Sequence, residues 1–178
     1  MITKEEWRDG TFRDKPDFKT QEMYYKSVGE FVKAYGEPTK EDMIVARSGH
    51  RKEFLTGKFG CSWNPNLNNT RNIAKLYLAD TIYVMVVPKG TMAVHYNIGE
   101  GEGKCALEEE YVFDMAGLGL NKKGKVGIIA EHTGEWDISS DYETDTDFER
   151  WRLKQPVPKC LIGIDRPLLN KFFASISL

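Results

Sequence analysis

The chain has 178 residues, of which 40% are hydrophobic and 29% are charged, and its formal net charge is −2. This length and composition are ordinary for one globular domain that buries its own core. The small negative charge argues against general electrostatic binding to nucleic acid. We therefore expect a single domain over residues 1–178, with a helical N-terminal part over 1–40.

The N-terminus and the cysteines both favour a cytoplasmic protein with no membrane partner. The first ten residues, MITKEEWRDG, are polar and mixed in charge, unlike a secretory signal. No apolar run approaches the length that a membrane span needs. Cys61, Cys105 and Cys160 are widely spaced, which favours reduced thiols over a disulfide framework or a zinc site.

Two helices are predicted in the N-terminal part. Thr3 and Glu6 have the spacing of a capping box, so a short first helix is expected there, ending at Gly10. The segment 11–19 carries a proline and mixed charges, and we expect it to be irregular. A longer helix is predicted over 20–35, because its apolar residues recur at helical spacing before a glycine and a proline.

A short apolar run over 43–46 is followed directly by Arg47. The planar, permanently charged fork of an arginine suits a pyrophosphate or a ribose better than a lysine does. The plainer interpretation is a surface arginine, and Arg51 is a near competitor for the same role. Further on, Asn69 or Thr70 can cap a helix that runs to about residue 78.

Three apolar runs in the middle of the chain predict three strands. The first, over 82–87, ends at a tight turn over 88–91, and the second covers 92–98. The third comprises Tyr111, Val112 and Phe113, directly after three glutamates at 108–110. Valine, isoleucine, tyrosine and phenylalanine dominate all three runs, which is strand composition bounded by turn residues.

The glutamates before the third strand allow two interpretations. Because side chains alternate across a strand, Glu108 and Glu110 share one face, whereas Glu109 lies on the other. Two carboxylates this close repel each other unless a cation or water relieves them. They form either the charged outer face of a solvated edge strand or a carboxylate pair in a cleft.

The C-terminal third is predicted to add strands and one helix. Strands are expected at 126–130, 151–153 and 160–164, and a final helix at 166–175. The acidic segment 131–149 lacks the glycine that a calcium loop needs, so we expect a solvated hairpin or loop and no bound metal.

The order of these features resembles the ADP-ribosyltransferase superfamily, specifically the toxin-like and phage-type enzymes with an Arg…Ser…Glu-x-Glu pattern. A strand ending in PKGT, a short second strand, a loop and then Glu-x-Glu before apolar residues carry the resemblance. It is clearest over 59–113 and extends back to Arg47. Ser62 supplies the only hydroxyl where the family has a Ser-Thr-Ser strand, and Gly60 or Cys61 takes the position of its leading serine.

The resemblance implies a fold, a reaction and a set of partners. The fold is α+β, with two small, mostly antiparallel sheets packed across an NAD cleft and helices around them. The reaction cleaves the nicotinamide–ribose bond of NAD, the co-substrate, and transfers ADP-ribose to a macromolecular acceptor, most simply a protein. In this family Glu-x-Glu accompanies modification of arginine more often than of other targets. Such enzymes act in a cytoplasm, their own or that of a host into which they are delivered.

The resemblance also implies roles for two carboxylates. Glu110, which directly precedes the apolar residues of its strand, would stabilise the positive charge that develops on the ribose. Glu108, two residues earlier on the same face, would orient or deprotonate the acceptor.

Four further residues would bind NAD if the resemblance holds. Arg47 would hold the diphosphate or a ribose, and Ser62 would hydrogen-bond either Glu110 or the nicotinamide ribose. The ring of Phe59 or of Trp63 would stack on nicotinamide.

Two other functions remain open at this point. The weakened serine motif is consistent with a non-catalytic binding or inhibitory module on the same fold. A metal-dependent nuclease built on the acidic clusters is a third hypothesis, although no Asp…Glu-x-Lys constellation follows a strand at suitable spacing. Release of nicotinamide from NAD would separate the first hypothesis from the other two.

Overall fold

The computed structural model describes residues 1–100, 109–120, 124–134, 151–153 and 158–174. Its helices, with three short 3-10 turns labelled η, are α1 (Lys4–Asp9), η1 (Thr11–Asp14), η2 (Pro16–Phe18), α2 (Gln21–Tyr35), α3 (Arg51–Thr56), α4 (Leu67–Tyr77), η5 (Lys159–Leu161) and α5 (Arg166–Phe173). Its strands are β1 (Glu37–Pro38), β2 (Met43–Gly49), β3 (Ser62–Trp63), β4 (Thr81–Val87), β5 (Met92–Tyr96), β6 (Glu110–Phe113), β7 (Val126–His132) and β8 (Trp151–Leu153).

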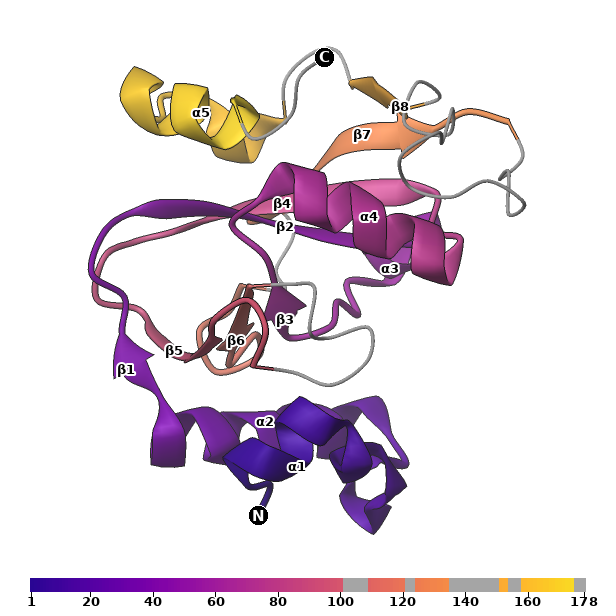
Figure 1. Cartoon of the computed structure of the whole chain (residues 1–178), viewed down its shortest axis with the longest axis vertical. Coiled ribbons are helices and arrows are strands. Elements are labelled where there is room, and N and C mark those ends of the chain that lie inside the picture. The colour runs from indigo at the N-terminus through magenta and orange to yellow at the C-terminus, as the bar shows by residue number, and fades with distance from the viewer. Residues whose placement is uncertain (101–108, 121–123, 135–150, 154–157, 175–178) are drawn as a thin grey trace.

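These elements form two neighbouring sheets with helices on the outer side of each (Figure 1). One sheet has the strand order β1-β5-β6-β3 and the other has the order β2-β4-β7-β8, and every strand pair is antiparallel. Helices α1 and α2 cover the outer side of the first sheet, and α4 and α5 lie beyond the second (Figure 1). The predicted α+β class with two small antiparallel sheets is confirmed.

Strand β4 lies between β2 and β7 in its sheet, and both of its faces are buried because a hydrophobic core lies on each side of the sheet. Tyr83 and Met85 belong to the core that includes the first sheet and α2, whereas Ile82 and Val84 belong to the core under α4 and α5. A strand covered on both sides reads as a continuous apolar run, which is why no alternation is visible over 82–87.

The chain crosses between the two sheets at two neighbouring points. The tight turn after β4 forms as predicted, with Gly90 at φ +89° and the Thr91 amide donating to the Pro88 carbonyl at 3.2 Å. It carries the chain from β4 into β5 of the other sheet. Thr39, between β1 and β2, ties the two crossings together: its hydroxyl donates to the Pro88 carbonyl and accepts from the Thr91 amide, both at 3.1 Å.

Strand β6 lies inside its sheet, paired with β5 on one side and β3 on the other. Val112 is opposite Val94 in one neighbour and opposite Ser62 in the other. The interpretation of this segment as a solvated edge strand is therefore wrong. Glu110 begins the strand, while Glu108 lies outside the described residues.

The N-terminal part follows its sequence signals closely. The capping box of Thr3 and Glu6 forms, and α1 ends at Gly10 in the left-handed conformation. Thr20 caps α2 as expected. The segment 11–19 is more regular than predicted, because η1 and η2 fold it over α2 and bury Phe12 in the core.

Three local predictions need correction. Helix α4 begins at Leu67, earlier than predicted, because the Asn66 side chain accepts from the Asn69 amide at 2.9 Å and caps the helix there. Helix α3 was not predicted; it has no buried residue and therefore no apolar periodicity. The strand expected at 160–164 is wrong, since η5 occupies the start of this segment and packs over β4 and β7 instead of pairing with them.

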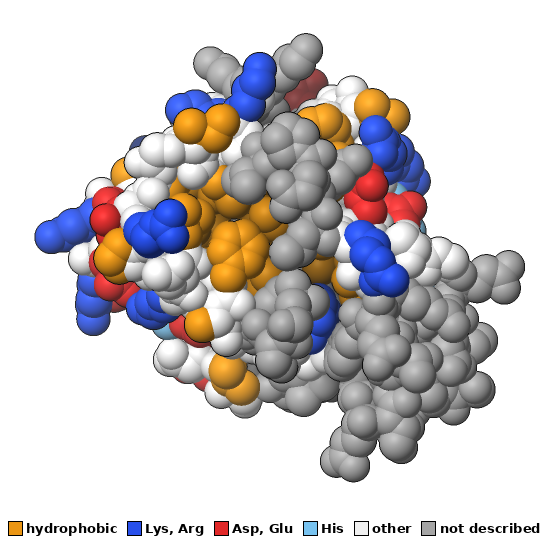
Figure 2. Space-filling view, turned by 90° about the horizontal axis from the view of Figure 1, so that it is seen from above, with side chains coloured by type: hydrophobic (Ala, Val, Ile, Leu, Met, Phe, Trp, Pro, Cys, Tyr) orange, Lys and Arg blue, Asp and Glu red, His pale blue; other side chains and the backbone are white. Residues whose placement is uncertain are grey.

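The C-terminal helix lies on the far side of the second sheet from α1 and α2 (Figure 1). Its Phe172 is buried in the core, whereas Ile162 in the preceding turn is 70% exposed. Viewed from this side, apolar side chains gather in the middle of the face, with lysine and arginine side chains around them (Figure 2). None of the described helices is long and apolar enough to span a membrane.

Candidate active site

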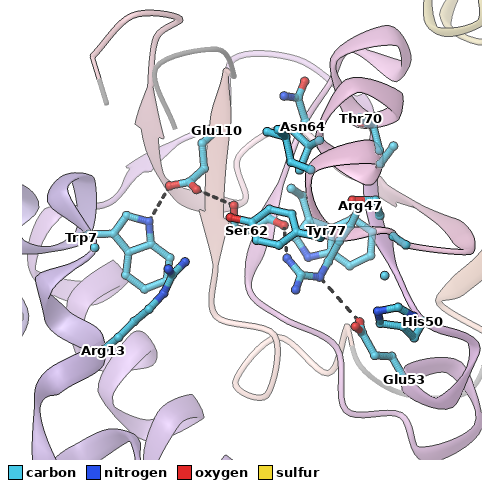
Figure 3. A pocket seen from close by; sticks show the side chains of 18 of the residues that line it. Trp7, Arg13, Arg47, His50, Glu53, Ser62, Asn64, Thr70, Tyr77 and Glu110 are labelled. Carbon is cyan, nitrogen blue, oxygen red and sulfur yellow. Dashed lines mark hydrogen bonds and ion pairs between the residues drawn. The ribbon is translucent and has the colours of Figure 1, made fainter. Parts of the chain in front are cut away.

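A cavity of about 630 Å³ opens where the N-terminal helices, β2, β3, β6 and α4 meet (Figure 3). Its volume is within the range of roughly 300–1,000 Å³ that is usual for small-molecule and cofactor sites. Four of the residues predicted to form the site line it: Arg47, Ser62, Trp63 and Glu110. These residues come from three strands, and the fold alone brings them together.

Glu110 is one of two glutamates that line this cavity, the other being Glu53. The Ser62 hydroxyl donates to its Oε2 at 2.5 Å, so the hydrogen bond predicted between these two residues is present. The indole Nε1 of Trp7 donates to its Oε1, also at 2.5 Å. Each carboxylate oxygen therefore accepts one hydrogen bond from these two side chains. Each oxygen has a second lone pair that neither donor uses.

Arg47 lies on β2, opposite the wall that carries Trp7 (Figure 3). Its Nη1 donates to the Ser62 carbonyl at 3.1 Å, and its Nε is 3.7 Å from the Glu53 carboxylate of α3. Ser62 thus links the arginine, through its backbone, to the carboxylate of Glu110, through its side chain. The competitor Arg51 pairs with Glu131 at 2.8 Å and does not line the cavity.

Gly60 makes room for the guanidinium of Arg47. A Cβ added to Gly60 would lie 2.3 Å from Nη2 and 2.4 Å from Cζ of that side chain. A side chain at this position would overlap the arginine, which accounts for glycine at one of the two positions where the resembled family has its leading serine.

Two tyrosines of α2 hold the segment before Ser62 in place. The Tyr25 hydroxyl donates to the Phe59 carbonyl at 2.6 Å, and the Cys61 amide donates to the Tyr24 hydroxyl at 3.2 Å. Burial raises the pKa of the Cys61 thiol to about 12, so this thiol stays protonated and does not act as a nucleophile near neutral pH. Burial also raises the pKa of Tyr24.

The two aromatic residues expected to stack on nicotinamide are both core residues. Phe59 is 3% exposed, packs edge-on against Tyr83 with ring centroids 5.1 Å apart, and does not line the cavity. Trp63 does line it, but it is 1% exposed and its indole donates to the Gly60 carbonyl at 3.0 Å. The half-exposed ring of Tyr77, on α4, also lines the cavity.

The neighbouring glutamate points elsewhere, as the alternation of a strand requires. Glu109 lies 2.9 Å from Nε2 of His95, whose ring stacks on Tyr111 with centroids 4.1 Å apart. Neither Glu109 nor His95 lines the cavity. The role predicted for Glu108 concerns a residue outside the described part of the chain.

Sequence reasoning missed Trp7 and Arg13, which reach the cavity from the N-terminal helices (Figure 3). No local pattern identifies them, because Trp7 is 103 residues away from the glutamate that it contacts. Within the described ranges, no group of three or more histidine, cysteine, aspartate or glutamate side chains is placed to hold a metal ion.

No protein-family model matches the chain, and no match was found among curated proteins or among solved structures.

Proposed function

We propose that the protein is an NAD-dependent mono-ADP-ribosyltransferase that uses this cavity. The observation that carries the proposal is the hydrogen bond of Ser62 to Glu110, with Arg47 bonded to the backbone of the same serine. An arginine, a serine and a glutamate of these types, in this chain order, are the pattern of the family that the sequence resembles. Their convergence on one cavity supports the proposal, because the order of the three residues along the chain did not require their side chains to meet.

Glu110 would act on the ribose. Cleavage of the nicotinamide–ribose bond leaves nicotinamide with the bonding electron pair and puts positive charge on the ribose, as in glycoside hydrolysis. A carboxylate held in place before the reaction stabilises that charge without reorganising. The donors on its two oxygens give Glu110 this fixed orientation.

Arg47 would bind the diphosphate or a ribose of NAD. Its present partner Glu53 is 3.7 Å away, too far for a good charge-assisted hydrogen bond, whereas a phosphate could engage the guanidinium fork with two bonds. Arg13 adds a second positive charge from the opposite wall of the cavity. Transfer to a protein acceptor, with Glu108 activating it, completes the proposal.

A non-catalytic binding module on the same fold is the second candidate. It is favoured by the pairing of Arg47 with Glu53, which partly neutralises the arginine that would bind phosphate. The metal-dependent nuclease gains no support from the described residues.

Glu110→Gln separates the two candidates. We expect the parent to release nicotinamide from NAD and the variant to lose about 100- to 1,000-fold in rate, the usual cost of removing one group that stabilises transition-state charge. Nicotinamide is measured by chromatography at saturating NAD. Glu109→Gln is the matched control, because it removes the same charge one residue away on the opposite face of the strand. A parent without turnover supports the binding module, and equal rates in the parent and Glu110→Gln reject the assignment of Glu110.

A further inference from the structure

The indole ring of Trp7, in the short N-terminal helix α1, is held in a fixed orientation by its neighbours. Its indole is stacked between two phenylalanines, with centroids 4.4 Å from Phe12 at 5° and 5.3 Å from Phe31 at 14°. The side chain is 5% exposed. Stacking on both faces leaves the ring little freedom, so the direction of its N–H is set by packing.

The helix that carries Trp7 is itself fastened to the rest of the molecule. The Tyr96 hydroxyl of β5 donates to the Lys4 carbonyl at 2.8 Å. Lys15 lies 2.7 Å from the Glu6 carboxylate, and Ile2 is buried in the core. The indole is thus held both by its own stacking and by the anchoring of α1 on the first sheet.

The single donor of this indole is directed at the carboxylate of Glu110. An indole offers one N–H and no acceptor, and here it donates to Oε1 of Glu110 at 2.5 Å. Ser62 supplies the donor to the other oxygen from the opposite side, as Figure 3 shows. Donors on both oxygens fix the position and the plane of the carboxylate, which one donor alone cannot do.

We propose that Trp7 is the positioning residue of Glu110, so that the N-terminal helical part completes the active site. The inference rests on the proposed function for its catalytic meaning. A carboxylate that must face a developing charge loses much of its effect when it is misplaced by about 1 Å, at a cost on the order of 100-fold in rate. Trp7 prevents this displacement and does not itself contact the reacting atoms.

Trp7→Phe tests the role because it keeps an aromatic ring between Phe12 and Phe31 while it removes the N–H donor together with the rest of the five-membered ring. We expect kcat for nicotinamide release to fall about 10- to 100-fold, with KM for NAD within about twofold of the parent. Tyr96→Phe is the matched control: it removes a hydrogen bond that anchors the same helix and leaves both side-chain donors to the Glu110 carboxylate in place. The free energy of unfolding is measured for both variants, because a purely structural role predicts that kcat falls only in proportion to lost stability; that result would overturn the positioning role.

A second measurement needs no turnover. The chain has four tryptophans, so its nitrogen–proton NMR spectrum contains four indole resonances, and Trp7→Phe identifies the one that belongs to Trp7. We expect that resonance to move in Glu110→Gln, because a charged acceptor is replaced by a neutral one, and to move more than that of Trp63, whose indole donates to the Gly60 carbonyl.

The outcomes distinguish the inference from the proposed function. An active parent with unchanged kcat in Trp7→Phe overturns the positioning role and leaves the proposed function standing. A Trp7 resonance that does not respond to Glu110→Gln overturns the contact whether or not the protein is an enzyme. A parent without turnover overturns the proposed function and the catalytic role of Trp7 together, even where the resonance shift confirms the hydrogen bond.

Discussion

Replacing Gly60 with alanine should disable NAD binding while leaving the fold intact. The new Cβ would lie 2.3 Å from Nη2 of Arg47, and ordinary contacts begin at 3.4 Å, so the guanidinium must move by about 1.1 Å. The atoms that it meets are the far end of a flexible side chain, so the arginine can swing away and the backbone need not shift. Its hydrogen bond to the Ser62 carbonyl, now 3.1 Å long, breaks in the process.

Hydrogen bonds to a charged group are worth about 1.5–3 kcal/mol, so an arginine displaced from its ligand costs on the order of 100-fold in affinity at the upper end. We therefore expect NAD affinity, measured by isothermal titration calorimetry, to fall by about this factor in Gly60→Ala. The free energy of unfolding should change by only about 1 kcal/mol, since one partly exposed hydrogen bond is lost. Gly29→Ala in α2 is the control: its added Cβ meets only the Asp114 carboxylate, at 3.2 Å, away from the cavity.

Two results would refute this reasoning. Parental NAD affinity in Gly60→Ala would mean that the position of Arg47 does not govern binding. Loss of the folded state in Gly60→Ala, but not in Gly29→Ala, would mean that Gly60 serves the backbone and not the arginine.

Two further predictions concern the same region. Arg47→Lys should weaken NAD binding although the charge is kept, because an ammonium cannot reproduce the bidentate fork of the guanidinium. Arg51→Lys is the control and should bind NAD as the parent does. Equal affinities in all three proteins would show that Arg47 does not bind NAD. Because burial raises the pKa of the Cys61 thiol from 9.0 to about 12, the unfolded chain loses this proton at a lower pH than the folded one. The free energy of unfolding should therefore fall between pH 9 and 12, by up to about 1.4 kcal/mol per pH unit from this group, and chemical denaturation of the parent and Cys61→Ala should show a steeper fall in the parent.

Local chemistry was sufficient to predict the N-terminal helices. A capping box joins residues three apart, so Thr3 and Glu6 predict the start of α1 without any information from the rest of the chain. Thr20 does the same for α2. Where the local signal is weak the predictions failed: α3 buries no residue, and the apolar residues after Lys159 look like a strand although no neighbouring strand accepts them.

Some residues of the candidate site could likewise be predicted from the sequence, and others could not. The resemblance drew attention to Arg47, Ser62 and Glu110, and the structure places all three around one cavity. Phe59 has the right chemistry for a stacking partner but packs into the core, because the faces of such a short segment cannot be assigned before its neighbours are known. Trp7 carried no signal at all, since its partner is 103 residues away.

The sequence by itself determined the caps of α1 and α2, the turn over 88–91 and the apolar runs, because each depends on residues only a few positions apart. Only the tertiary structure decided which strands pair. The turn between β4 and β5 looks like a hairpin connection, yet the two strands belong to different sheets. The composition of a strand indicates how its faces are buried. It does not indicate which strand it pairs with through backbone hydrogen bonds. The crossing between sheets, and with it the meeting of Arg47, Ser62 and Glu110, follows from packing the whole chain around its cores.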